Sequence, residues 1–336
     1  MKVGINGMQQ AKREVIQAQR ELAFAVKLDE IRYRKWLWVL EAGRGGMVSP
    51  WLAASEYRAA FAAFDLDLIA LAPDVAAWRI AESGVKTEII AAVDDWALYE
   101  GFSAHNEHLL DIVRRADPGG WLDRLRDPKV RTDVTAVTRL ANDADVQLLS
   151  PTALSTLAEL MNRNGLDPSP VLRRARVAHP SEFELAFALG QWHLGHARYQ
   201  QIAQYEAACA LRPDNTTVWM QLADALKTWG DDEGAIAAYR KIIELEPKYA
   251  HAHTNLGNFH FQKKNYADCI LCAKYAISAD PKRSNGYALL GRALQATGDI
   301  SGARVALTEA ARLDATWAEM LAQLPPVPLA PPPRPK

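Results

Sequence analysis

The chain has 336 residues, 49% of them hydrophobic and 24% charged, a composition typical of a folded protein. Its formal net charge of −1 excludes a global basic field that would hold nucleic acid or an acidic membrane surface. Three cysteines are too few for a secreted disulfide scaffold, and the N-terminus lacks the apolar run of a signal peptide. No apolar stretch approaches the roughly 20 residues needed to span a bilayer. We therefore expect a soluble, cytoplasmic protein that binds neither nucleic acid nor a membrane.

Residues 1–45 are predicted to form an N-terminal helix. Val15, Ala18, Leu22 and Ala25 recur at spacings of three and four, which places them on one helical face. A coiled coil needs about three to four such heptads, and this stretch offers about two. A homodimer through this helix therefore stays open as an alternative to a monomer.

The end of this segment, "RYRKWLW" at residues 32–38, mixes cations with aromatic side chains. Such a mixture is found in patches for nucleic acid or membrane surfaces. We favour the interpretation that the tryptophans pack inward and the cations form the solvated side of the helix. The stretch "EAGRGGMVSP", residues 41–50, predicts a break in the chain.

Residues 50–146 are predicted to be an irregular helical region with two groups of candidate chemistry. In "HNEHLLD", His105, His108 and Asp111 are spaced by three, so neighbours share a helical face. This is not the His-Glu-x-x-His pattern of a zinc site, and a polar helix face is the favoured interpretation. Asp94 and Asp95 are adjacent and point in different directions, so we expect them to face solvent or pair with arginine.

Segments of residues 50–180, among them "AAVDDWALYEG" and "VRRADPGGWLDRLRDP", resemble the region that follows the kinase domain in planctomycete-type bacterial serine/threonine protein kinases. In that family, helical repeats follow directly, so the resemblance extends to residue 315. The Gly-rich loop, the His-Arg-Asp loop and the Asp-Phe-Gly motif of a kinase are absent from this sequence. We therefore expect no catalysis and no catalytic residue. The residues that carry the resemblance are Asp94, Asp95, Trp96, Ala116, Asp117, Pro118, Trp121, Asp123, Arg124, Arg126, Asp127 and Pro128.

A period of 34 residues organises the C-terminal part, because Pro213, Pro247 and Pro281 lie at that spacing. The same frame holds an aromatic position, a leucine, a small residue on a first helix and a small residue on a second helix. Each unit is therefore predicted to be a helical hairpin that ends at a proline. The frame is Trp219, His253 and Tyr287; Leu222, Leu256 and Leu290; Ala223, Gly257 and Gly291; and Ala235, Cys269 and Ala303.

Two kinds of small residue have a physical role in this frame. Gly257 and Gly291 let the first helix approach the second closely. Gly230 and Gly298 stand in the turn between the helices, where a left-handed backbone is needed, and Lys264 replaces glycine in the middle unit.

This pattern resembles the tetratricopeptide repeat, with copies at 214–247, 248–281 and 282–315. A fourth copy precedes them at 181–213, and residues 147–180, further upstream, are predicted to be a degenerate repeat. Trp317 and Leu321 are expected to form a short cap, so the repeat domain spans 181–324. The resemblance implies an all-α solenoid.

The pair Cys269 and Cys272 lies close to His253 and His260, which raises the question of a zinc site. In the repeat frame, Cys269 takes the small position between helices, where a free cysteine packs like a small hydrophobe. His253 takes the aromatic position. We therefore expect packing residues, with no metal and no cofactor bound.

Repeats of this family stack so that their first helices line a groove that binds a peptide or protein partner. Asn258 fits one position of the carboxylate clamp found in some members, but the matching lysines are absent. Asn255 resembles one rung of an asparagine ladder that Gln221 and Leu289 interrupt. The predicted groove residues are Thr217, Met220, Asp224, Lys227, His251, Thr254, Asn258, Phe261, Asn285, Arg292 and Gln295.

The tail, residues 325–336, is rich in proline and is predicted to be extended polyproline II. It is either a spacer or itself a ligand for an aromatic-lined groove. For the whole chain we expect a scaffold in bacterial signalling that holds a protein or peptide partner. The alternative is the docking part of a kinase whose catalytic domain is absent from this chain.

Overall fold

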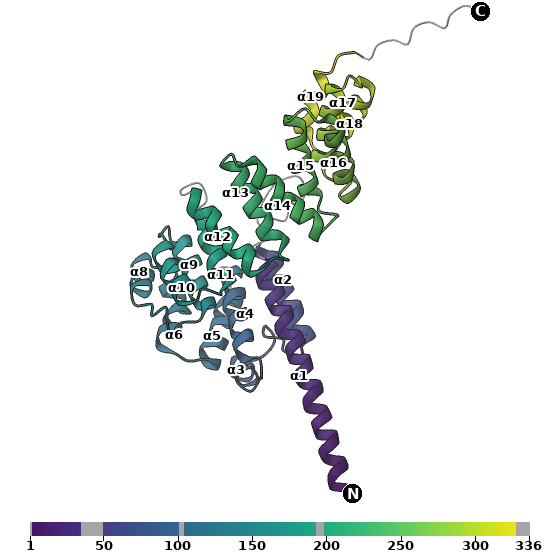
Figure 1. Ribbon diagram of the computed structural model, residues 1–336. Helices are drawn as coiled ribbons and strands as arrows, with labels where there is room; N and C mark the ends of the chain where they lie inside the picture. Colours follow the sequence, from purple (N-terminus) through teal and green to yellow (C-terminus); the bar gives the residue numbers. More distant parts are fainter. Residues whose placement is uncertain (1, 35–49, 101–103, 193–197, 327–336) are drawn as a thin grey trace, which may run out of the picture. The chain divides into compact units, whose positions relative to one another are not determined.

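The computed structural model describes residues 2–34, 50–100, 104–192 and 198–326, and these are all-α, with no β-strand among them (Figure 1). They divide into two compact units at residues 192 and 193. Within the described ranges, no helix is both long enough and apolar enough to cross a membrane. The expected all-α solenoid of helical hairpins is confirmed for the three repeats of residues 214–315.

The described residues of the first unit include two hydrophobic cores. In one core, Trp96 is fully buried and stacks on Tyr57 and Phe61, with ring centroids 6.2 and 5.7 Å away. The other core gathers leucines such as Leu154 and Leu157. The helices of this unit are α1 (Lys2–Arg34), α2 (Pro50–Ala63), α3 (Pro73–Ala81), α4 (Lys86–Tyr99), α5 (Ala104–Ala116), α6 (Gly120–Leu125), α7 (Pro128–Arg131), α8 (Val134–Asn142), α9 (Pro151–Arg163), α10 (Ser169–Ala178) and α11 (Phe183–Trp192).

Helix α1 packs through its C-terminal third. Phe24, Leu28 and Ile31 are buried in the first core, and Phe24 stacks on Phe64 with ring centroids 4.0 Å apart. Residues 10–20 are exposed throughout. The predicted heptad positions Val15 and Leu22 are 56% and 64% exposed, so they do not pack within the described residues. Dimerisation through this helix stays a prediction, and residues 35–45 of the predicted N-terminal helix, like most of "RYRKWLW", lie outside the described residues.

The second unit contains the three hairpins that the 34-residue period predicts. The helices pair as α13 with α14, α15 with α16 and α17 with α18, and each pair begins and ends within two or three residues of the predicted unit. The helices of this unit are α12 (Arg198–Leu211), α13 (Thr216–Thr228), α14 (Asp232–Leu245), α15 (Ala250–Gln262), α16 (Tyr266–Ala279), α17 (Ser284–Ala296), α18 (Ile300–Leu313), a 3₁₀ turn η1 (Ala315–Trp317) and α19 (Ala318–Ala322).

The small residues stand where helices touch. A Cβ atom added to Gly257 on α15 would lie 2.6 Å from Leu289 and 3.0 Å from Cys272, which leaves no room for a side chain. The same atom on Gly291 would lie 2.6 Å from Leu307 of α18. Ala235, the small residue of the second helix, is fully buried. The close approach inferred from sequence is therefore confirmed.

In the first two hairpins, the aromatic position of the frame connects to the preceding proline. Trp219 Nε1 donates to the carbonyl of Pro213 at 2.9 Å, and His253 Nε2 lies 2.8 Å from the carbonyl of Pro247. Two different side chains thus make an equivalent contact six residues back. In these two repeats, the contact joins the first helix to the residue that ends the preceding unit.

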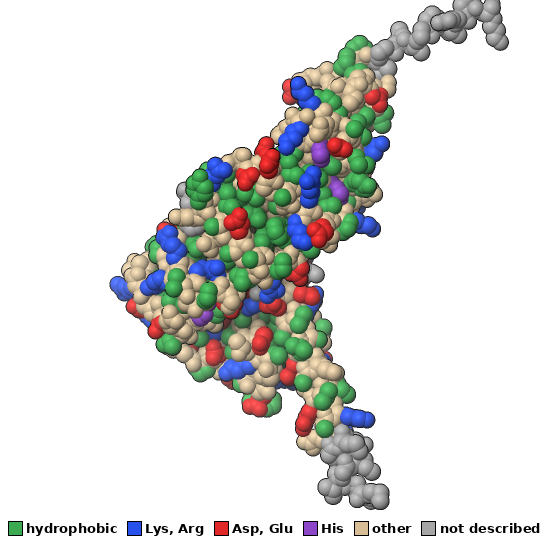
Figure 2. Space-filling view, in the orientation of Figure 1, with side chains coloured by type: hydrophobic (Ala, Val, Ile, Leu, Met, Phe, Trp, Pro, Cys, Tyr) green, Lys and Arg blue, Asp and Glu red, His purple; other side chains and the backbone are tan. Residues whose placement is uncertain are grey.

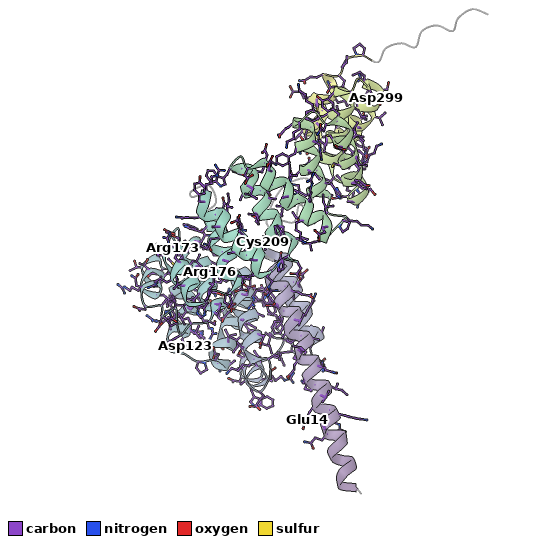
Figure 3. All side chains as sticks on the ribbon, viewed as in Figure 1. Glu14, Asp123, Arg173, Arg176, Cys209 and Asp299 are labelled. Atoms are coloured by element: carbon purple, nitrogen blue, oxygen red, sulfur yellow. The ribbon has the colours of Figure 1, made fainter. Side chains whose placement is uncertain are left out.

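The short elements η1 and α19 follow the last hairpin. Trp317 and Leu321 pack against the core formed by α17 and α18, and Trp317 Nε1 donates to Ser284 Oγ at 3.2 Å. Asp299, labelled in Figure 3, caps the start of α18 by accepting from the Gly302 amide at 2.8 Å. Residues 327–336 of the proline-rich tail lie outside the described residues.

The two upstream copies differ in where they lie, because α9 and α10 are inside the first unit and only the fourth copy spans the division. Residues 151–178 form α9 and α10, with Gly165 at a φ of 71° in the turn between them, and the degenerate repeat at 147–180 stays a prediction. The predicted fourth copy consists of α11 and α12, and the division between the two compact units falls inside it. The predicted domain boundary at residue 181 thus stays a prediction.

The turn of the middle repeat contains a lysine in the left-handed region. Lys264 has a φ of 60°, whereas Gly230 and Gly298 occupy the equivalent turns at 80° and 89°. A side chain in this conformation costs about 1 kcal/mol or more, and glycine avoids that cost. We expect Lys264→Gly to raise the free energy of unfolding of the repeat unit by about 0.5–1 kcal/mol, because glycine's larger unfolded-state entropy offsets part of the gain. Urea unfolding of the full chain measures this change.

The reverse substitution provides the matched control. A Cβ atom at Gly298 would meet no atom within 4 Å, so Gly298→Ala changes backbone strain without a steric clash. It should lower the free energy of unfolding by about 1 kcal/mol. A loss of stability in Lys264→Gly would contradict the strain argument.

Candidate functional site

The predicted groove residues lie on α13, α15 and α17, the first helices of the three repeats, and α15 lies against α17. They differ in exposure. Thr217, Met220 and Thr254 are 5%, 1% and 5% exposed, so these three support the surface from beneath. Lys227 and Gln295 are exposed. The half-buried residues are Asp224, His251, Asn258, Phe261, Asn285 and Arg292.

A cluster of three groove residues connects α15 with α17. The Arg292 guanidinium lies over the Phe261 ring, 4.4 Å from its centroid, and its Nη1 donates to Asn258 Oδ1 at 3.5 Å. The Tyr266 ring packs edge-on against Phe261 with centroids 5.6 Å apart. Stacking on an aromatic face holds a guanidinium by about 0.5–1 kcal/mol at a partly exposed site. Arg292 is therefore held in place on this surface, where its other N–H donors can bind an acceptor.

A second group connects α13 with α15. Lys227 Nζ donates to Asn255 Oδ1 at 3.2 Å. Asn255 is 5% exposed, and its Nδ2 has no hydrogen-bond partner in the described part of the chain. An unpaired buried donor costs about 1–3 kcal/mol. The sequence pointed to Asn255 only as one rung of an interrupted ladder, whereas the structure singles it out by its unpaired amide.

Asp224 is engaged within the fold. Its Oδ1 accepts from Tyr239 Oη at 2.6 Å, and burial raises the pKa of Asp224 above its ordinary value, while the Tyr239 hydrogen bond lowers it. The same burial, together with the nearby Asp224 carboxylate, raises the pKa of Tyr239. The Asp224 carboxylate therefore bonds α13 to α14 within the repeat.

His251, at the start of α15, is a neutral imidazole at ordinary pH. The pKa of His251 is lowered to about 4, mainly by burial and to a smaller extent by the cations Arg283 and Lys227. Basic side chains and histidines gather over α15 and α16 on the face seen in Figure 2. The groove residues thus combine held cations, a neutral imidazole and amides.

Cys269, Cys272 and His253, three of the residues that raised the question of zinc, pack or form hydrogen bonds within the repeats. Cys269 and Cys272 are 0% and 8% exposed, and burial raises the pKa of each thiol to about 11. His253 bonds the Pro247 carbonyl and stacks on Tyr275 with centroids 5.3 Å apart. Zinc binds the thiolate, and a raised pKa keeps a thiol protonated. The buried thiols of Cys269 and Cys272 therefore favour the interpretation as packing residues over that as zinc ligands.

The N-terminal candidates are likewise engaged in structure. His108 Nε2 lies 2.9 Å from the Leu68 carbonyl, and Asp111 accepts from Arg115 at 3.0 Å. Asp94 pairs with Arg126, as expected, but it is buried instead of solvated. Asp95 is also buried and accepts from Tyr57 Oη at 2.7 Å. The expectation of solvent is therefore wrong for Asp95, whereas Asp94 takes the expected alternative of an arginine partner.

Comparison with known proteins fits the repeats. A family model described as a TPR repeat matches residues 229–264, which span α14 and α15. None of the curated proteins matches the chain. Among solved structures, a crystal structure of MamA is 19% identical, with a TM-score of 0.44, and covers 47% of this chain and 95% of that one.

Two further structures are similar at this level. MamA residues 41 to the end from Desulfovibrio magneticus RS-1 are 19% identical, with a TM-score of 0.39, over 42% of this chain and 82% of that one. YrrB, described as a TPR protein with an unusual peptide-binding site, is 14% identical, with a TM-score of 0.45, over 61% of this chain and 99% of that one. The family-model match, the 34-residue period and the three hairpins define an all-α protein with tetratricopeptide repeats.

Proposed function

We propose that the chain is a protein-interaction scaffold that binds a peptide segment of a partner protein along the groove residues of α13, α15 and α17. The observation that carries the proposal is the half-buried Arg292 guanidinium, which lies over the Phe261 ring and bonds Asn258, so that its other N–H donors can bind an acceptor. A peptide carbonyl or carboxylate is such an acceptor. YrrB, which has a peptide-binding site, offers a parallel in fold class only.

Arg292 is positioned before any partner arrives. Its guanidinium rests on Phe261 and bonds Asn258. A side chain that is already ordered loses less conformational entropy on binding. Buried arginines and aromatics are also the residue types that contribute most to binding at interfaces.

A double substitution tests the groove. Asn258→Ala combined with Arg292→Ala removes the cluster across α15 and α17 while leaving both helix cores intact. Peptides selected against the native chain from a displayed random library should bind the variant more than tenfold more weakly, as expected when interface arginines are truncated. Fluorescence anisotropy with one labelled selected peptide measures this affinity.

The matched control is Arg240→Ala, which removes an exposed cation from α14, a second helix outside the groove. This variant should bind the peptide like the native chain. Equal affinity of the double variant and the native chain would remove the groove from the proposal, provided that circular dichroism shows both to be folded.

A role in bacterial signalling and association with a serine/threonine kinase belong to the same proposal. They are supported by the sequence resemblance of residues 50–315 alone. Location in the cytoplasm is supported by the three cysteines, which are free and buried. Co-purification of a kinase with the native chain, and its loss with the double variant, would support the signalling role.

A further inference from the structure

Several sequence motifs that the groove does not use meet in the first unit. Arg126 Nε and Nη2 donate to the two carboxylate oxygens of Asp94 at 2.9 and 2.8 Å. Arg126 Nη1 also donates to the Asp117 carbonyl at 2.8 Å. The Arg126 side chain is only 2% exposed, so this ion pair holds α4 against the chain that follows α5. Pro128, from the same motif, begins α7 and lines a cavity.

This cavity has a volume of about 300 Å³, at the lower end of the range for small-molecule sites. Its walls come from α4, α5, α7 and α9 of the first unit. Leu98, Leu160 and Pro128 supply an apolar wall. Arg131 and Arg163 supply positive charge. The cavity thus has an apolar wall with two cations beside it.

Arg131 is the unusual member of this lining. It is half-buried at the end of α7, and its side chain has no hydrogen bond or ion pair within the described residues. The pKa of Arg131 is lowered to about 10, mainly by burial and to a smaller extent by the positive charge of Arg163. Asp94 raises it, but that carboxylate is already held by both arms of Arg126. Arg131 is therefore a desolvated cation without a carboxylate of its own.

Other lining residues have fixed orientations. Arg163 donates to Glu159 at 3.0 Å and to the Leu98 carbonyl at 2.6 Å, so its charge is held at the wall. Asn164 uses its Nδ2 to bond the carbonyls of Arg131 and Leu160, at 3.1 and 2.8 Å. These bonds hold the backbone that carries Arg131. The guanidinium thus lies on a rigid support beside an apolar wall.

We propose that this cavity binds a small organic carboxylate, with the Arg131 guanidinium bonding the carboxylate and the apolar wall holding the body of the ligand. A guanidinium presents two parallel N–H donors that match the two oxygens of a carboxylate. The wall of Leu98, Leu160 and Pro128 favours a ligand with a flat or branched apolar body over a bare inorganic anion. This site is independent of the groove, because it lies wholly in the first unit.

The first experiment uses the full chain and two probes of the same shape. Benzoate carries a charge that benzamide lacks, and both have the same ring. Isothermal titration calorimetry should show benzoate binding at least tenfold more tightly than benzamide. Inorganic phosphate, which has no apolar body, should bind more weakly than benzoate. Equal binding of benzoate and benzamide, or tighter binding of phosphate, would overturn the proposal without any variant.

A substitution then assigns the site. Arg131→Gln should weaken benzoate binding at least tenfold, whereas Arg139→Gln, which removes an exposed arginine on the neighbouring helix α8, should leave it unchanged. Arg131→Lys keeps the charge but not the paired donors and should give an intermediate affinity. Undiminished benzoate binding by folded Arg131→Gln protein would show that Arg131 does not hold the carboxylate.

Discussion

Arg126→Leu should lower the free energy of unfolding of the first unit by about 3–5 kcal/mol, the usual cost of removing one partner from a buried ion pair. The guanidinium bonds both oxygens of Asp94, and its side chain is 2% exposed. Burial already raises the pKa of Asp94 above its ordinary value, although Arg126 lowers it. Without Arg126, this carboxyl must either stay charged in an apolar environment or take up a proton.

Two controls separate this effect from a general loss of charge. Arg124→Leu removes a neighbouring arginine whose partner Asp143 is exposed, so its 2.8 Å ion pair should contribute less than about 1 kcal/mol. The double variant Asp94→Leu with Arg126→Leu should recover part of the loss, because no charge is then left unpaired. Urea unfolding gives the free energies, and hydrogen exchange of peptides from α4 assigns the change to this unit. Equal losses in Arg126→Leu and Arg124→Leu would contradict the prediction.

The repeats could be predicted closely because their signals are local. A proline ends each unit, a glycine or its substitute lies in each turn, and a small residue stands where the helices cross. Even the exception at Lys264 is a left-handed residue, as its place in the frame indicates. These requirements act within a few residues of the chain, so a single sequence carries them.

The exposure of the groove residues could not be predicted in the same way. Thr217, Met220 and Thr254 occupy groove positions in the frame but are buried. Their burial depends on how one hairpin packs on the next, which the 34-residue period does not describe. The unpaired amide of Asn255 is likewise a property of its neighbours in space.

Long-range pairing in the first unit shows the same limit. The sequence indicates that Asp94 and Asp95 need partners, but Arg126 lies 32 residues from Asp94 and Tyr57 lies 38 residues from Asp95. Many arginines are equally plausible from sequence alone. Only the packing of α4 against the residues that follow α5 selects Arg126. The cavity that Arg131 lines is likewise formed by α4, α5, α7 and α9, which are far apart in the sequence.

The second large effect is expected for the repeat unit at acid pH. Burial lowers the pKa of His251 in the folded chain to about 4, against an ordinary value of about 6.5 in the unfolded chain. Below pH 6.5 the unfolded state therefore binds a proton that the folded state does not. Stability from this group is complete above pH 6.5 and is lost as the pH falls toward 4. Between pH 7.5 and pH 5, the free energy of unfolding should decrease by about 2 kcal/mol from His251.

The variant His251→Gln isolates this contribution from the other titrating groups. Glutamine has a similar polar reach but no charge change, so the variant should keep about 2 kcal/mol more of its stability over the same pH interval. Hydrogen exchange of peptides from α13 to α17, corrected for the intrinsic dependence of exchange on pH, measures stability where His251 lies. Lys227 and Arg283 oppose protonation by their positive charge, so Lys227→Met should reduce the pH dependence slightly. If the native chain and His251→Gln lose stability in parallel below pH 6.5, then His251 takes up its proton as readily in the folded chain as in the unfolded one, and its burial carries no electrostatic cost.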